Sequence, residues 1–110
     1  MRYVFHPEAL TEYAEAVQYY TGQRVEVAQA FINAIEDTVY RIRASPTHYV
    51  VIDDAVRRCM ARRFPYAILY TIEQDYILIL AVMHCSREPG YWTKSGKVVD
   101  SRSSQQPNGD

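Results

Sequence analysis

The spacing of apolar residues changes once along this chain, near Pro46, and that change restricts the fold more than any other feature. Apolar residues recur at helical spacing up to about Arg43, then follow the pattern of β-strands from about Val56 to His84. Because helices and strands bury apolar faces with different periods, the first half predicts helices and the second half a sheet. The sequence therefore predicts an α+β fold.

Two helices are expected in the first half. The first begins at Pro7, where the missing N–H costs nothing, and ends near Gly22. The second runs from about Val25 to Arg43 and ends before Pro46. A short β-prone segment from Arg2 to Phe5 precedes both helices.

Three consecutive strands are expected in the second half, at Val56 to Arg63, Tyr66 to Ile72 and Tyr76 to His84. Both faces of the last strand are apolar, which predicts a central strand covered by the helix pair. Strict alternation places Leu78, Leu80 and Val82 on one face and Ile77, Ile79 and Ala81 on the other. The expected order is β-α-α-β-β-β, with two N-terminal helices packed on a small antiparallel sheet.

A chain of 110 residues has the length of one domain. We expect this domain to cover residues 1–94 and the polar residues 95–110 to form a disordered tail. No apolar run approaches the roughly 18 to 20 residues of a membrane-spanning helix. No leader precedes the first helix, and the two cysteines lie in apolar contexts, so we expect a soluble protein of the reducing cytoplasm.

The net charge of −1 conceals an asymmetry. Residues 1–54 carry four Arg against eight Asp and Glu, a balance of −4, whereas residues 55–110 carry eight Arg and Lys against five, a balance of +3. A chain without overall positive charge is a poor candidate for indiscriminate binding to duplex nucleic acid, although a local basic face can steer it toward RNA or an acidic partner. The alternative is an ordinary mixed surface.

Cationic and aromatic residues gather at both ends of the predicted hairpin. They are Arg57, Arg58, Arg62, Arg63 and Tyr66 before it, and His84, Arg87, Tyr91 and Trp92 after it. The apolar strands between them could hold both groups rigidly side by side. We therefore expect a site that faces phosphate or a protein partner.

Two motifs at hairpin distance carry a resemblance to a known family. The first is Arg62-Arg63-Phe64-Pro65-Tyr66, and the second is His84-x-x-Arg87-x-Pro89-x-Tyr91-Trp92. With the element order, they make residues 1 to about 94 similar to the RelE/ParE superfamily of bacterial toxins. The resemblance implies the toxin of a type II toxin–antitoxin, or plasmid stabilisation, module, encoded beside an antitoxin that binds and silences it.

Members of that superfamily divide by target: some cleave messenger RNA in the ribosomal A site, and others inhibit DNA gyrase. In the RNA-cleaving branch the catalytic places are matched here by Arg63, His84, Arg87 and Tyr91. The expected function is therefore ribosome-dependent mRNA cleavage by a metal-independent endoribonuclease, an mRNA interferase. The alternative is a gyrase inhibitor or an inactive module that only binds its antitoxin. The implied partners are a cognate antitoxin and either the ribosome with its mRNA or DNA gyrase, with no membrane.

Metal-free RNA cleavage needs a base, an acid and positive charge on the phosphorane. His84 could supply the acid or base near neutrality, and the alternative is a histidine that closes a strand and bonds to backbone. Arg63 and Arg87 suit bidentate phosphate contact, and their alternative is surface ion pairing.

The flanking residues Arg57, Arg58, Arg62, Tyr66 and Trp92 are expected to bind RNA or a partner. Strand alternation predicts that Arg57 and Arg63 share one face while Arg58 and Arg62 share the other. Tyr91 and Trp92 could stack on a base, and Trp92 could instead cover the sheet edge. The alternative for Tyr66 is a core position with a wet hydroxyl.

Cysteines and histidines show no metal-binding spacing. Cys59, Cys85, His48 and His84 include neither a Cys-x-x-Cys nor a His-x-x-x-His pair. We therefore expect no metal site and no cofactor.

Overall fold

The computed structural model describes residues 1–87 of the chain. Strand β1 (Arg2–Phe5) leads into helices α1 (Pro7–Gln23) and α2 (Val25–Ala44), both within a residue or so of their predicted ends. Four strands follow: β2 (Val51–Asp53), β3 (Val56–Met60), β4 (Tyr66–Ile72) and β5 (Tyr76–His84). The predicted α+β class is confirmed. Neither helix is long and apolar enough to cross a membrane.

Within residues 1–87 the sheet contains five strands in the order β1-β5-β4-β3-β2. Consecutive strands from β2 to β5 pair antiparallel, whereas β1 pairs parallel with β5, so the sheet is mixed. The sequence predicts neither β2 nor the direction of β1, because a three-residue strand has almost no period and apolar spacing does not encode strand direction. Strand β5 has a neighbour on each side, as its two apolar faces predict.

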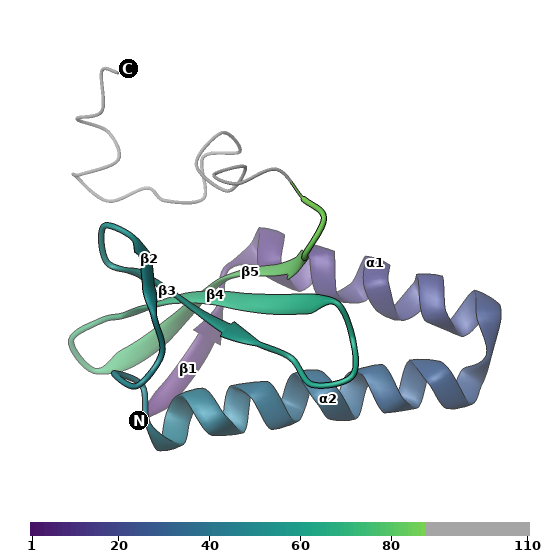
Figure 1. Ribbon diagram of the computed structural model, residues 1–110, viewed down its shortest axis with the longest axis horizontal. Coiled ribbons are helices and arrows are strands. Elements are labelled where there is room, and N and C mark those ends of the chain that lie inside the picture. Colours follow the sequence, from purple (N-terminus) through teal and green to yellow (C-terminus); the bar gives the residue numbers. More distant parts are fainter. Residues whose placement is uncertain (88–110) are drawn as a thin grey trace.

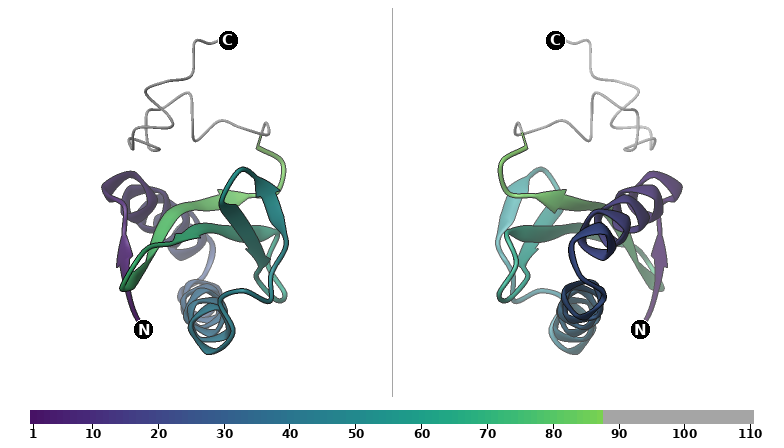
Figure 2. Two further views of the ribbon diagram at one scale, coloured as in Figure 1. Left: turned by 90° about the vertical axis from the view of Figure 1, so that its left-hand side faces the viewer. Right: turned by 90° about the vertical axis from the view of Figure 1, so that its right-hand side faces the viewer.

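Helices α1 and α2 pack as a hairpin against one face of the sheet (Figures 1 and 2). The core between them is centred on Phe31, Ile68, Tyr70 and Ile79, all 0% exposed. A smaller cluster of Val56, Leu69, Leu80 and Ala81 forms on the opposite face, where Ile52 of β2 packs against it. Strands β2 and β3 curl over this second face (Figure 2) and cover it in part, because Arg58 and Met60 of β3 stay exposed.

A β-bulge in β5 determines which way its C-terminal half faces. Leu69 pairs with Ala81 and Tyr70 with Ile79, which leaves Leu80 as the extra residue. Ala81 therefore joins the cluster on the second face, and Val82 joins the helix-side core. Strict alternation is wrong for these two residues, because the extra residue shifts the period by one. The same shift turns His84 toward α1.

Strand β3 ends at Met60, three residues before the predicted end at Arg63. The backbone of Arg63 lies in the left-handed region, with φ of 74°, which costs a non-glycine residue about 1–3 kcal/mol. The turn points Phe64 inward, where its ring centroid lies 5.2 Å from Tyr20 and 5.3 Å from Phe31. Burial of Phe64 helps to offset the strain.

Candidate functional site

Three of the predicted site residues meet in one shallow recess on the α1 side of the sheet. Tyr66, His84 and Arg87 lie there with Val82 and with Glu12, Glu15, Ala16 and Tyr19 of α1. The recess has a volume of about 190 Å³. It exists because the β5 bulge turns His84 toward the helix, and it is the place where catalysis by His84 would have to occur.

The His84 ring is held by its own chain. Its Nδ1 atom accepts a hydrogen bond from the Ser86 backbone N–H at 3.0 Å, and the Ser86 Oγ atom lies 2.8 Å away. A backbone N–H can only donate, so Nδ1 carries no proton and the neutral ring has its proton on Nε2. The geometry is that of a histidine closing a strand and bonded to backbone. A base role would require the nitrogen that Ser86 occupies.

Tyr66 belongs mainly to the core. It is 9% exposed, its ring packs 4.9 Å from that of Phe31, and the His84 ring meets it edge-on at 5.1 Å. Burial, with a smaller effect of Tyr20, raises the pKa of its hydroxyl. The proton therefore stays on the Tyr66 hydroxyl at neutral pH, and the contacts of the ring indicate a packing role.

Two carboxylates in the same recess were not predicted from the sequence. Glu12 accepts a hydrogen bond from the Val82 N–H at 2.9 Å through Oε1, and Glu15 lines the recess beside it. Their helical spacing assigns both to a polar, solvent-facing side of α1, and only the position of the sheet reveals that this side borders the recess. Their negative charge disfavours an RNA phosphate at this place.

Arg62 and Arg63 line a different recess, between the β3–β4 turn and α2. Its volume is about 280 Å³, and Ala30, Asn33, Ala34 and Asp37 of α2 form the rest of its lining. Arg62 Nη1 lies 3.7 Å from Asp37 Oδ2, an ion pair whose arginine side chain is 68% exposed. The prediction that Arg63 faces away from Arg62 is wrong, because the turn begins after Met60 and strand alternation stops there.

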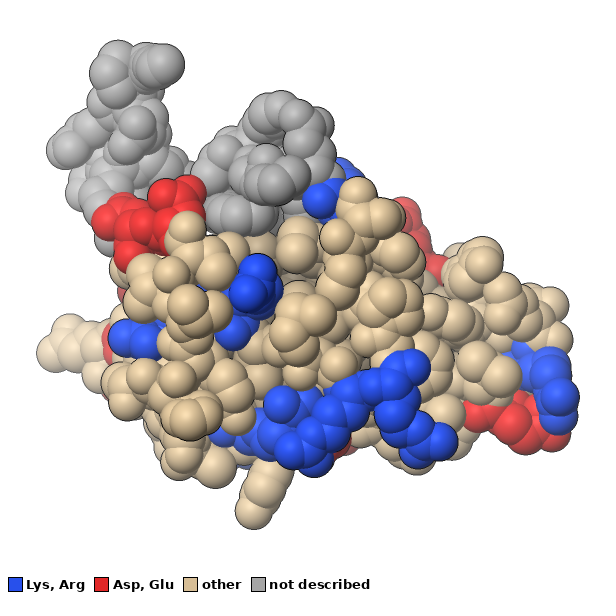
Figure 3. Space-filling model, in the orientation of Figure 1, with Lys and Arg blue, Asp and Glu red and all other residues tan. Residues whose placement is uncertain are grey.

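Arg57 is committed to a structural contact. Its Nη1 donates to the carbonyl oxygens of Thr47 at 3.0 Å and Tyr49 at 2.7 Å, which fixes the loop before β2. Arg58, the next residue of β3, is exposed and follows Val56 onto the second face of the sheet by strand alternation. The predicted basic residues are therefore dispersed, and Figure 3 shows basic side chains in separate groups rather than one patch.

Two predicted site residues, Tyr91 and Trp92, lie outside the described residues. Within residues 1–87, no three His, Cys, Asp or Glu side chains are grouped so that they could hold a metal ion. The recess around His84 thus combines one histidine, one arginine and two carboxylates, whereas Arg63 belongs to another surface.

Comparison with known proteins gives a family and a fold. The family described as the ParE toxin of type II toxin–antitoxin systems, parDE, matches residues 3–89. A solved structure of the chromosomal ParDE system from P. aeruginosa superposes with a TM-score of 0.68 at 16% identity, covering 76% of this chain and 95% of that chain. No curated protein sequence matches the chain.

Proposed function

The chain belongs to the family of ParE toxins of type II toxin–antitoxin systems, and we propose that it poisons DNA gyrase by binding it rather than cleaving messenger RNA. Its protein partner in such a system is an antitoxin. Both candidate targets lie in the cytoplasm, which is where we propose that it acts. The arrangement of residues around His84 is the observation that favours gyrase over messenger RNA as the target.

RNA cleavage would need a base, an acid and cationic support around one phosphate. The Ser86 N–H occupies Nδ1 of His84, and Glu12 and Glu15 line the same recess. Arg63, the expected phosphate ligand, lines a separate recess with Asp37. This distribution supports a toxin that acts without proton transfer.

Inhibition by binding has different requirements. A binding toxin needs a rigid surface of suitable shape and charge, and no residue has to titrate. The exposed guanidinium groups of Arg58, Arg62 and Arg63 stand on a turn and strand anchored by Phe64, so they can be presented in fixed positions. In the superfamily that the motifs resemble, gyrase is the target that is inhibited by binding.

The test is induced expression in a bacterial host of the wild type and of His84→Gln, with growth, transcript integrity and plasmid supercoiling followed together. Glutamine keeps a side-chain oxygen that can accept from Ser86, so this variant removes the imidazole ring with little change in structure. Glu26→Gln, an exposed change on α2 outside that arginine surface, serves as the matched control for expression level.

We expect both the wild type and His84→Gln to arrest growth with intact transcripts and altered supercoiling. Rapid transcript cleavage that His84→Gln abolishes would establish a ribonuclease and overturn the proposal. A folded wild type that leaves growth unchanged would also contradict it, and would indicate a module that only binds its antitoxin.

A further inference from the structure

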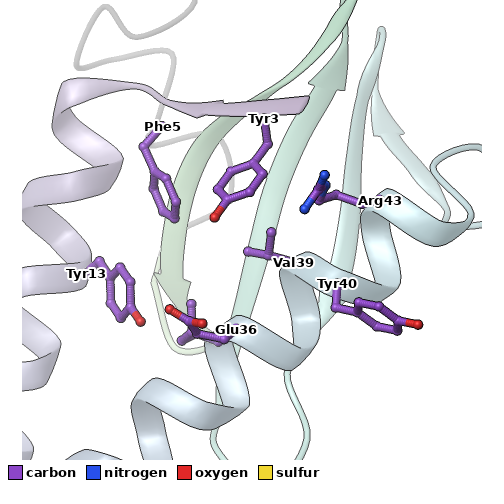
Figure 4. Close-up of a pocket in the computed structure, with 8 residues that line it drawn as sticks. Tyr3, Phe5, Tyr13, Glu36, Val39, Tyr40 and Arg43 are labelled. Atoms are coloured by element: carbon purple, nitrogen blue, oxygen red, sulfur yellow. The ribbon is translucent and has the colours of Figure 1, made fainter. Parts of the chain in front are cut away.

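A third cavity lies beneath the edge strand β1, where that strand passes over α2. It has a volume of about 240 Å³, and its walls include Tyr3, Phe5, Tyr13, Glu36, Tyr40 and Arg43 (Figure 4). None of these residues belongs to the cluster that the sequence motifs define. The cavity is separate from the His84 recess and shares no lining residue with it.

Aromatic side chains make up half of the eight residues that line the cavity. Phe5 stacks on Tyr13 with ring centroids 5.9 Å apart, and Tyr3 meets Phe5 edge-on at 6.0 Å. Ring faces attract cations, most strongly where water is partly excluded. This wall already holds one cation, since the Arg43 guanidinium lies 5.3 Å from the centroid of the Tyr3 ring.

Glu36 supplies a negative charge to the same cavity. Its carboxylate points into the space between Tyr13 and Tyr3 (Figure 4). Within the described part of the chain, no hydrogen bond or ion pair engages it. The Glu36 charge acts on the neighbouring Tyr13 hydroxyl. The pKa of Tyr13 is raised to about 12, mainly by burial and secondly by Glu36. A carboxylate among aromatic rings is suited to a bound ammonium or guanidinium group.

We propose that this cavity binds a basic side chain, arginine or lysine, of the antitoxin. The inference rests on the chain's membership of a toxin–antitoxin family and not on the choice of gyrase as target. Charge complementarity supports it, because residues 1–54 carry a balance of −4 from four Arg and eight Asp and Glu. Arg43 is tied to the Met1 carbonyl oxygen at 3.0 Å, which leaves the position beside Glu36 to the incoming cation.

The edge of β1 explains how a peptide could deliver that side chain. Within the described residues, β1 has a strand on one side only. The His6 N–H donates to the Ile79 carbonyl oxygen at 2.8 Å, so the backbone of His6 faces β5. Because backbone N–H and C=O groups alternate in direction along a strand, those of Tyr3 and Phe5 point to the outer edge of the sheet. A peptide strand added there would lie about 4.8 Å away and project alternate side chains over the cavity.

The first experiment uses a small probe on the full chain. N-acetyl-arginine amide is titrated into the isotope-labelled protein, and the signals of Glu36 and of the Tyr3, Tyr13 and Tyr40 rings are followed by NMR. N-acetyl-citrulline amide, a neutral molecule of the same shape, is the matched ligand. We expect shifts with the arginine probe alone, lost in Glu36→Gln and kept in Glu26→Gln, an exposed change on the same helix.

Equal shifts from the two probes, or shifts retained in Glu36→Gln, would overturn the proposal. The absence of any shift, even at the highest concentration of the arginine probe, would also overturn the proposal. Each result is independent of growth arrest, so failure here leaves the proposed target untouched.

The second experiment uses the antitoxin encoded beside the toxin, with affinity measured by calorimetry. We expect Glu36→Gln to weaken binding by about tenfold or more, and Glu26→Gln to leave it unchanged. Glu36→Gln should still arrest growth when expressed alone, because none of the exposed arginines proposed to bind gyrase lines the cavity. Unchanged antitoxin affinity in Glu36→Gln, with the fold intact, would contradict the proposal.

Discussion

At the scale of single residues, the Tyr70 hydroxyl joins the sheet to the chain that follows α2. It donates to the Pro46 carbonyl oxygen at 2.6 Å, and Tyr70 is 0% exposed. Tyr70→Phe keeps the ring and leaves a partly buried carbonyl without this donor. We expect the free energy of unfolding to fall by about 1–3 kcal/mol at pH 7, measured by urea denaturation. An unchanged midpoint would contradict this account.

The same hydroxyl predicts sensitivity to alkaline pH. Burial raises the pKa of Tyr70 to about 12, against the lowering effect of Arg57. A pKa raised in the folded state stabilises the fold below the unfolded value of about 10, and this stabilisation is lost as pH rises through about 12. We therefore expect the stability difference between wild type and Tyr70→Phe to narrow from pH 10 to 12. A constant difference would argue against a buried neutral hydroxyl.

The fold brings together only some of the residues that the sequence groups into one site. It identifies Tyr66, His84 and Arg87, which share a recess, but groups Arg63 with them, although a left-handed turn carries that residue to α2. Glu36 escapes notice because a lone glutamate on an amphipathic helix gives no local signal. Such placements depend on packing between distant segments.

At the scale of elements, Glu12 fastens α1 to β5 beyond the point where β1 ends. Its Oε1 atom accepts from the Val82 N–H at 2.9 Å, three residues past Ile79, the last residue paired with β1. We expect Glu12→Ala to lower the free energy of unfolding by about 1–3 kcal/mol, and Glu12→Gln, which keeps an acceptor, to lower it less. Chemical denaturation measures this free energy. An equal decrease in the two variants would show that the hydrogen bond to Val82 does not account for the stabilising effect of Glu12.

Local signals predict the helices closely, because Pro7 and Pro46 act through the backbone of their own neighbours. The strands are predicted less well. The bulge at Leu80 and the early end of β3 at Met60 arise from fitting side chains across the sheet, and strand periodicity carries no trace of either.

At the scale of the whole molecule, the sheet separates two apolar clusters of unequal size. Phe31 of α2, at 0% exposure, contacts rings from α1, the β3–β4 turn and β4. We expect Phe31→Ala to cost about 3–5 kcal/mol and Leu69→Ala, in the second cluster, about 2–5 kcal/mol. Val25→Ala, at a residue that is 70% exposed, should change stability by less than about 0.5 kcal/mol. A small effect of Leu69→Ala would show that β2 and β3 do not seal the second face.

The whole molecule also presents distinct surfaces for distinct tasks. The cavity under β1, the His84 recess and the arginine recess on α2 share no lining residue. An antitoxin side chain bound under β1 therefore uses none of the residues that line the other two recesses.

A gyrase supercoiling assay with purified proteins tests the central claim most directly. Relaxed plasmid, gyrase and ATP are incubated with increasing amounts of toxin, either wild type or His84→Gln, with and without the antitoxin. We predict that both proteins inhibit supercoiling to the same extent and that the antitoxin relieves the inhibition. Full gyrase activity at saturating toxin, together with cleavage of ribosome-bound mRNA that His84→Gln abolishes, would contradict the account.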